Sequence, residues 1–223
     1  MPKIFKVIKE EIKTVYSGNT LDTVFPSIIF VIVQSKTSLI NAIIFAVSIA
    51  LILALYRFFK GQKSIYAFGG VLGVALAGGY SYYMGNAASY FLSKLLSTGF
   101  LAGLSFISLL IGRPIAAYLS HLSRGWPIEW FWHKKVKPAY NEVTLAWGVL
   151  FSLRLLILFI AYRDENVSAL LWLSTLLGTP STIIILILTF LYGTFRLKNL
   201  KGPGVEEFIA KKDPPWEGQT RGF

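Results

Sequence analysis

The chain has 223 residues, of which 54% are hydrophobic and 15% are charged, and its formal net charge is +11. A soluble domain carries roughly 25% charged residues, so the composition argues against a soluble protein. The basic residues lie mainly in short segments between long apolar runs, so they indicate membrane topology rather than nucleic-acid binding. The sequence has no cysteine, which excludes disulfides and thiolate chemistry.

Residues 1–18 form the first predicted element, an amphipathic helix. Its apolar residues share one helical face: Ile4, Phe5, Ile8, Ile12, Val15 and Tyr16. Lysines occupy much of the remaining surface. A basic amphipathic helix beside a membrane usually lies in the interface, so we expect this segment to lie on the membrane surface. A cytoplasmic helix packed on the loops is the alternative.

Six apolar segments follow, and we interpret each as a membrane-spanning helix. A hydrocarbon core of about 30 Å requires roughly 20 apolar residues in a helix. The predicted spans are residues 20–35, 38–58, 63–84, 97–118, 141–162 and 171–195. The first is the shortest and contains Pro26, so we expect a tilted or half-buried helix there.

Lysine and arginine are distributed unevenly between the two sides of these spans. With the N-terminus in the cytoplasm, all but four of the 22 lie on the cytoplasmic side, and the four are Lys36, Lys94, Arg154 and Arg163. Positive residues are enriched in cytoplasmic segments of membrane proteins. The count therefore predicts that both termini are cytoplasmic.

The predicted fold is an all-α, polytopic membrane helical bundle over residues 19–197. The interfacial helix at 1–18 precedes it, and a cytoplasmic tail containing Pro and Trp follows at 198–223. An internal repeat, LSKLLST at Leu92–Thr98 and LSTLLGT at Leu173–Thr179, favours a bundle built from helical hairpins. The two copies are separated by an even number of spans, so they share one orientation in the membrane.

Seven segments occur in an order that resembles a known family: VFPSIIF, YRFFKGQ, FGGVLGVALAG, ASYFLSKLL, ISLLIGRPIAAYL, AYNEVTLAWGVLFSLRLL and LLGTPSTIIILILTFLYG. Together they resemble a multi-pass membrane family of unknown function, known mostly from actinobacteria. That family is itself similar to the intracellular septation protein A group. The resemblance covers roughly residues 19–197. It implies a protein of the bacterial inner membrane, linked loosely to cell-envelope processes, and it implies no catalytic residues.

Few residues suggest a metal site, a phosphate-binding loop or a catalytic site. His121 and His133 have no neighbouring carboxylate cluster, so their spacing is not a metal pattern. The glycine-rich run of the third span lacks the Lys-Ser/Thr of a phosphate-binding loop, and its glycines favour close helix packing instead. We therefore expect no metal site, no cofactor and no enzymatic activity.

Arg154 is the outstanding polar residue, because a charge within a membrane span is costly and often functional. It is predicted to face a polar cavity and bind an anion or pair with a carboxylate. A structural ion pair, or an arginine that extends outward to the interface, is the alternative. Asn41 and Gln34 could add neutral hydrogen bonds, and Pro180 would kink the sixth span. Kinked helices can mark transport sites, although packing kinks are as frequent.

Residues 124–137, RGWPIEWFWHKKVK, combine aromatic and basic side chains. Trp126, Trp130 and Trp132 suit the headgroup region of a bilayer, and Lys134 and Lys135 suit anionic lipid headgroups. The loop is therefore predicted to anchor the protein at the membrane interface. Docking of a protein partner is the alternative.

The sequence is compatible with two functions. The first is a permease-like protein for a small, anionic solute or a lipid, which the repeat, the kinked sixth span and Arg154 favour. The second is a non-catalytic accessory or scaffold subunit of a larger membrane complex or of cell-envelope machinery. The scarcity of polar residues in the spans favours this second function. The expected partners are the lipid bilayer and either a membrane protein complex or further copies of the chain, and not nucleic acid.

Overall fold

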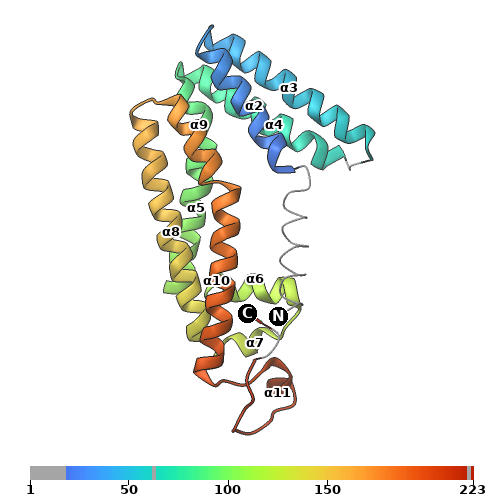
Figure 1. The fold of residues 1–223 in the computed structure, drawn as a ribbon, viewed down its shortest axis with the longest axis vertical. Coiled ribbons are helices and arrows are strands. Elements are labelled where there is room, and N and C mark those ends of the chain that lie inside the picture. Colours follow the sequence, from blue (N-terminus) through green and yellow to red (C-terminus); the bar gives the residue numbers. More distant parts are fainter. Residues whose placement is uncertain (1–18, 62–63, 220–221) are drawn as a thin grey trace. The chain divides into compact units, whose positions relative to one another are not determined.

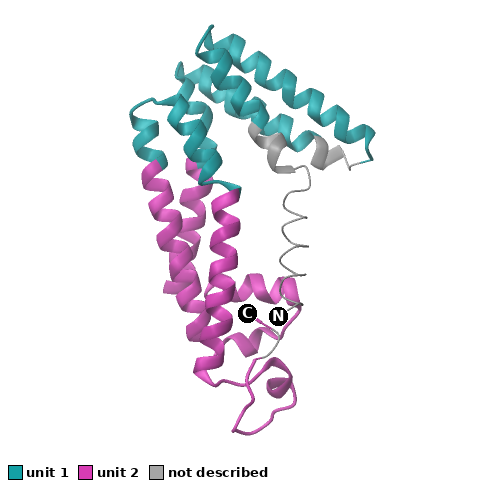
Figure 2. Cartoon of the chain, viewed as in Figure 1, with its two compact units in different colours: residues 1–94, 158–179 teal, residues 95–157, 180–223 magenta. Residues whose placement is uncertain are grey.

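The computed structural model describes residues 19–61, 64–219 and 222–223, all of whose regular structure is helical (Figure 1). The predicted interfacial helix at 1–18 lies outside the described residues. Contacts divide the chain into two compact units (Figure 2). Unit 1 contains the described residues up to Lys94 together with Leu158–Thr179, and unit 2 contains Leu95–Ile157 and Pro180–Phe223.

Unit 1 is built around three consecutive helices, α2 (Asn19–Gln34), α3 (Leu39–Phe59) and α4 (Ser64–Met84). The unit also contains the short 3-10 helix η1 (Ala87–Phe91) and α9 (Val167–Leu176). η1 packs against α4 and α9, and α2 also contacts α9. The unit is therefore completed by η1, which follows α4 almost directly, and by α9, which is distant in sequence.

Alanines explain how α3 packs between its neighbours. Its buried residues recur at every fourth position: Ala42, Ala46, Ala50 and Ala54. Residues four apart share one helix face, and small side chains there let neighbouring helices approach closely. α4 comes so close that a Cβ added to Gly78 would lie 2.7 Å from Cγ2 of Ile43.

Unit 2 contains most of the long helices α5 (Leu92–Leu110) and α8 (Lys137–Arg163) and nearly all of α10 (Thr179–Leu200). Glycine allows α5 and α8 to pack closely, because a Cβ on Gly148 of α8 would lie 3.0 Å from Cζ of Phe106 in α5. α8 is tied to α10 by the indole of Trp147, which donates a 3.1 Å hydrogen bond to Oγ1 of Thr189.

The short helices of unit 2 gather at one end of these long helices. They are α6 (Ile115–Arg124), α7 (Ile128–Phe131) and α11 (Val205–Ile209). A buried cluster joins them to α8 and α10: Ala116, Ala117, Trp126, Trp130, Phe131, Val136, Ala139, Tyr140, Val143, Leu197, Val205 and Phe223. We call this region the carboxyl-terminal lobe. It is held by aromatic packing, which is more typical of a soluble core than of a lipid-facing helix.

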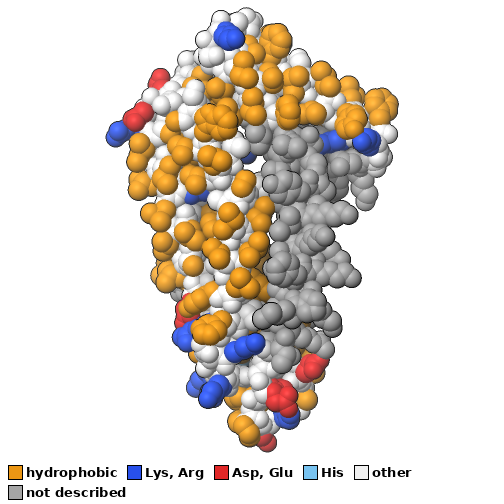
Figure 3. Space-filling view, viewed as in Figure 1, with side chains coloured by type: hydrophobic (Ala, Val, Ile, Leu, Met, Phe, Trp, Pro, Cys, Tyr) orange, Lys and Arg blue, Asp and Glu red, His pale blue; other side chains and the backbone are white. Residues whose placement is uncertain are grey.

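By length and composition, four helical segments among the described residues can cross a membrane: Leu39–Phe59, Ala87–Leu110, Lys137–Arg163 and Val167–Leu200. The apolar part of α2, Phe25–Gln34, is shorter. Large hydrophobic side chains are exposed along the long helices, as Figure 3 shows for one face. The predicted class is confirmed, since the regular structure of the described residues is all helical and the protein is a multi-pass membrane protein.

Two predicted spans differ from the helices in the structure. The fourth, expected at 97–118, begins earlier and ends at Leu110, and α6 starts anew at Ile115. Gly112 adopts a left-handed φ of +71° there and Pro114 follows, and both residues end an α-helix. The sixth, expected at 171–195, is divided into α9 and α10 at residues 177–178.

Candidate functional site

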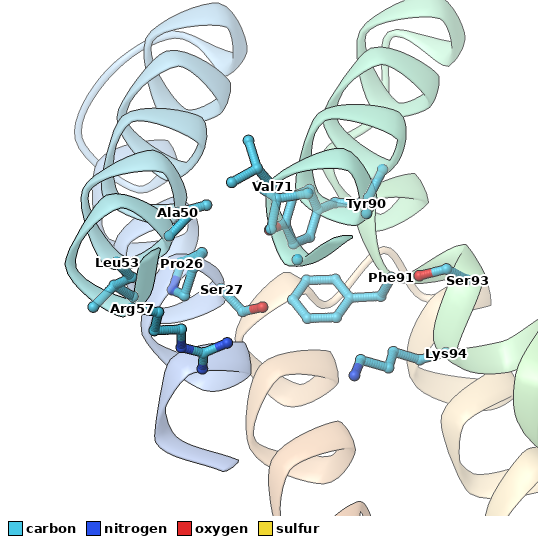
Figure 4. A pocket seen from close by; sticks show the side chains of 15 residues that line it. Pro26, Ser27, Ala50, Leu53, Arg57, Val71, Tyr90, Phe91, Ser93 and Lys94 are labelled. Carbon is cyan, nitrogen blue, oxygen red and sulfur yellow. The ribbon is translucent and has the colours of Figure 1, made fainter. Parts of the chain in front are cut away.

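A pocket of about 260 Å³ lies within unit 1, between α2, α3, α4, η1 and the first turn of α5 (Figure 4). Most of its lining residues are apolar, and they include Leu53, Val71, Val74 and Phe91. Ligand sites typically combine such a wall with a few polar groups that fix orientation. The pocket therefore has the general character of a small-molecule site.

The charged residues that line this pocket are both cationic. Arg57 belongs to the last turn of α3, and Lys94 to the first turn of α5. Figure 4 shows their side chains reaching toward one side of the pocket from opposite walls, with the hydroxyl of Ser27 and the ring of Phe91 between them. Two cations at one side of an apolar pocket favour a ligand that carries negative charge.

Glycines on α4 widen the pocket. Gly70 and Gly73 both line it, and a Cβ added to either would meet no other atom within 4 Å. The sequence predicted that the whole glycine-rich run allows close helix packing. These two glycines do not make such a close contact. Gly78 does serve it, through its contact with Ile43.

Hydrogen bonds and ring stacking hold η1 in place as one wall of the pocket. The side chain of Asn86 accepts a 2.7 Å hydrogen bond from the N–H of Ala88 and donates a 2.6 Å bond to Oε1 of Glu165, just before α9. At the other end of η1, Tyr90 stacks on Phe30 of α2 with ring centroids 4.0 Å apart. η1 is thus fixed at both ends, which positions Phe91 and Lys94.

Arg154, the predicted anion ligand, lies half-buried on α8 in unit 2. Its Nη1 donates a 3.3 Å hydrogen bond to Oγ1 of Thr182 on α10. Within the described part of the chain, its Nε has no hydrogen-bond acceptor and no carboxylate forms an ion pair with it. The contact with Thr182 therefore makes Arg154 a link between two helices.

The other residues of the predicted substrate site are not assembled around Arg154. Gln34 is half-buried at the end of α2 and Asn41 is exposed on α3, both in unit 1. Pro180 is exposed at the second position of α10 in unit 2. None of the four residues lines the pocket of unit 1. Over the described residues, no group of three His, Asp or Glu is placed to hold a metal ion.

The predicted interface tryptophans fall into two classes. Trp126 and Trp130 are 8% and 0% exposed, and they belong to the aromatic core of the carboxyl-terminal lobe. The indole N–H of Trp130 donates a 2.9 Å hydrogen bond to the carbonyl of Pro203. Trp132 is half-buried, and the guanidinium carbon of Arg113 lies 4.5 Å from its ring centroid. Burial in this core leaves Trp126 and Trp130 little surface for headgroups.

Lys134 and Lys135 are exposed, beside a folded part of the tail. The ring of Trp216 lies 5.4 Å from Lys135 Nζ and 5.4 Å from the ring of His133, both distances measured to ring centroids. Burial, and secondly the charge of Lys135, lower the pKa of His133 below its usual value. We call Lys134, Lys135, His133 and Trp216 the basic-aromatic patch.

The tail folds around one carboxylate. Glu207 of α11 accepts hydrogen bonds from the N–H groups of Gly204 at 2.8 Å, Glu217 at 2.9 Å and Gly218 at 3.1 Å. These bonds, led by the one from Gly204, lower the pKa of Glu207 below its usual value. The sequence predicted only a tail containing Pro and Trp at residues 198–223. Its proline and glycine content gives no indication that one half-buried carboxylate, Glu207, orders the segment through three backbone hydrogen bonds.

Sequence reasoning missed Arg57 and Lys94 as site residues. In the sequence, both residues bear only on membrane topology: Arg57 lies in a predicted cytoplasmic segment and Lys94 does not. The sequence held one signal for Lys94. A very short connection follows the third span, and the segment SYFLSK then places this lysine directly after apolar residues. Only the fold of η1 back against α4 places that lysine in the same pocket as Arg57.

Comparisons with known proteins give a family but no characterised relative. Neither the curated proteins nor the solved structures contain a significant match to this chain. A family model described as "Protein of unknown function (DUF3159)" matches residues 17–198, which include the long helices of both units and exclude α11. The chain is therefore a member of the DUF3159 family of proteins of unknown function.

Proposed function

We propose that this membrane protein is permease-like and that unit 1 binds its substrate, a small anionic solute or a lipid. The observation that supports this function is the apolar pocket with Arg57 and Lys94 in its lining. Charged residues in membrane segments are rare and often mark substrate pathways. In this proposal the protein is not an enzyme, and the binding site is the pocket rather than Arg154.

The proposed topology has six spans in the bacterial inner membrane, with both termini in the cytoplasm. α2 and α4 join the four segments that are long and apolar enough to cross. The uneven distribution of lysine and arginine supports this orientation, and the resemblance to the septation protein A group supports the location. Residues 1–18 would then lie on the cytoplasmic membrane surface.

In this topology, the position of η1 explains how the pocket forms. Arg57 would stand near the cytoplasmic end of α3, and Lys94 would follow a connection on the outer side. Because η1 packs back against α4, Lys94 is carried inward to a pocket that Arg57 also lines. A site lined by one cation from each side of the membrane suits alternating access, in which a central site opens to each side in turn.

Flux in reconstituted vesicles tests this function. Purified full-length protein in proteoliposomes should release a trapped panel of organic anions and short-chain anionic lipids faster than protein-free liposomes do. The double variant Arg57→Gln/Lys94→Gln should lose that release. The matched control Lys36→Gln/Lys60→Gln removes two exposed charges of the same unit and should keep it. Release that survives the loss of Arg57 and Lys94 would contradict the proposal.

A second candidate function is that of an accessory subunit in a larger membrane complex. The basic-aromatic patch of the carboxyl-terminal lobe favours it, because Lys134 and Lys135 are exposed beside Trp216. Aromatic residues such as Trp216 are enriched at protein interfaces, and exposed lysines beside them can match an acidic surface on a partner. Purification in a gentle detergent should then retain a second protein, and Lys134→Glu/Lys135→Glu should release it. A lone monomer from both preparations would argue against this function.

A further inference from the structure

We infer that the ligand of the unit 1 pocket is an anionic phospholipid, a lipid whose phosphate headgroup carries net negative charge, with its phosphate between Arg57 and Lys94 and a hydrocarbon chain along the apolar wall. This inference rests on the proposed function and names its substrate class. The inference uses both the cationic side chains and the apolar wall of the pocket. The cations select the headgroup, and the wall selects the tail.

The headgroup end follows from the chemistry of the two cations. A guanidinium donates paired N–H groups that match two phosphate oxygens, and an ammonium binds phosphate as a point charge. Figure 4 shows Arg57 and Lys94 on opposite walls of one side of the pocket, with the hydroxyl of Ser27 near them as a further polar group. Basic pockets between membrane helices commonly bind lipid headgroups in this way.

The apolar wall distinguishes a lipid from a soluble anion. Leu53, Val71, Val74 and Phe91 offer a small hydrated anion no hydrogen bonds. A soluble anion would lose part of its hydration there without compensation. A hydrocarbon chain gains free energy on the same surface, in proportion to the apolar area that it covers.

Room for the chain is provided by α4. The side of the helix that bears Gly70 and Gly73 is open, since a Cβ at either position would meet no atom within 4 Å. A larger side chain could therefore be introduced at Gly73 without a clash at its Cβ. Such a side chain would occupy the space that we assign to the lipid tail.

Equilibrium binding to the full chain in detergent micelles tests the ligand class with three probes. Dihexanoyl phosphatidic acid carries headgroup charge and tails, glycerol 3-phosphate carries the charge alone, and dihexanoyl phosphatidylcholine carries the same tails with no net charge. We expect phosphatidic acid to bind at least about tenfold more tightly than either of the others, because only it satisfies both the cations and the apolar wall.

Two variants with matched controls locate the binding. Arg57→Gln/Lys94→Gln should weaken phosphatidic acid binding by about 30-fold. Lys36→Gln/Lys60→Gln, which removes two exposed charges of the same unit outside the pocket, should leave it unchanged. Gly73→Leu should remove the advantage of phosphatidic acid over glycerol 3-phosphate. Gly79→Leu is its control, because Gly79 is on the same helix, equally open, and outside the pocket. Thermal unfolding in micelles identifies any variant that fails to fold.

The outcomes separate the ligand class from the transport function. Glycerol 3-phosphate binding as tightly as phosphatidic acid, or equal binding to the Arg57→Gln/Lys94→Gln protein, would overturn the lipid assignment. Flux of a soluble anion that depends on Arg57 and Lys94 would overturn it as well, while leaving the permease-like function intact. Tight phosphatidic acid binding at this pocket without any flux would support the ligand class and refute transport.

Discussion

The guanidinium of Arg196 on α10 holds both carboxylate oxygens of Glu142 on α8. Nε lies 2.8 Å from Oε2, and Nη2 lies 2.9 Å from Oε1. The hydroxyl of Tyr192, one turn earlier on α10, donates a 2.7 Å hydrogen bond to Oε2. This two-point contact joins two long helices of unit 2 at the end that bears the carboxyl-terminal lobe. Paired hydrogen bonds of this kind fix orientation as well as distance.

We predict a measurable coupling between Glu142 and Arg196. In a double-mutant cycle with Glu142→Gln and Arg196→Gln, the interaction energy should be about 1 kcal/mol, because each side chain is about one-third exposed and is screened. Unfolding of the purified protein by SDS titration in mixed micelles measures it.

The pair Arg163–Asp164 is the control for this cycle. Its atoms approach to 3.2 Å, but the side chains are 71% and 53% exposed, so its coupling should be close to zero. Equal coupling energies for the two pairs would show that the two-point geometry between α8 and α10 adds no stability.

Trp130 should be a main support of the carboxyl-terminal lobe. Trp130→Phe removes the hydrogen bond to the carbonyl of Pro203 and leaves a void in a fully buried site. We expect a loss of about 1–3 kcal/mol in the free energy of unfolding. Trp172→Phe, at a site that is 63% exposed on α9, should change it by less than about 0.5 kcal/mol. The melting temperature in micelles reports both, and equal shifts would argue against the described core.

Hydropathy predicted where the long helices lie, because bilayer thickness imposes a minimum length on apolar runs. Thus α3 and α8 match the predicted spans 38–58 and 141–162 to within a few residues. The ends at Gly112 and at Gly178 were harder to place, since apolar residues resume after Arg113 and Pro114 at the first break and continue through the second. Composition alone does not report a left-handed glycine or a helix restart.

The site was less predictable than the helices, because it depends on contacts distant in sequence. Arg154 stood out as a charge inside an apolar run, yet its hydrogen-bond partner is the neutral Thr182. Lys94 drew no attention, because nothing local shows that η1 packs on α4 and stacks Tyr90 on Phe30. Residues 124–137 were also ambiguous in the sequence, since a tryptophan such as Trp130 suits a headgroup region and a buried core equally well.

Arg154 is predicted to have a structural role. Arg154→Gln removes the hydrogen bond to Thr182, because the glutamine amide ends two bonds short of the guanidinium nitrogen, so the free energy of unfolding should fall by about 1 kcal/mol. Binding of phosphatidic acid at the unit 1 pocket should be unchanged in this variant. Loss of binding or of flux in a folded Arg154→Gln protein would restore Arg154 as a substrate ligand.

The tail should lose its folded structure at acidic pH, when protonation of Glu207 weakens the hydrogen bonds that its carboxylate accepts. Backbone N–H groups, that of Gly204 foremost, lower the pKa of this carboxyl below its ordinary value of 4.5. A carboxylate with a lowered pKa stabilises the folded tail at pH values above the unfolded pKa, and the stabilisation is lost as the pH falls through the folded pKa. Hydrogen-exchange protection factors for the segment around Gly204 and Gly218 should therefore be high at neutral pH and should fall below about pH 4.5.

Glu207→Gln separates this effect from general acid unfolding. The amide is a weaker acceptor than the carboxylate and does not titrate, so protection of this segment should be lower at neutral pH and should no longer follow the pH. Glu217→Gln is the control, because its side chain is 85% exposed and its hydrogen bond to Glu207 comes from the backbone. That variant should behave like the parent protein. If Glu207→Gln keeps the parent's acid transition, another group must control the tail.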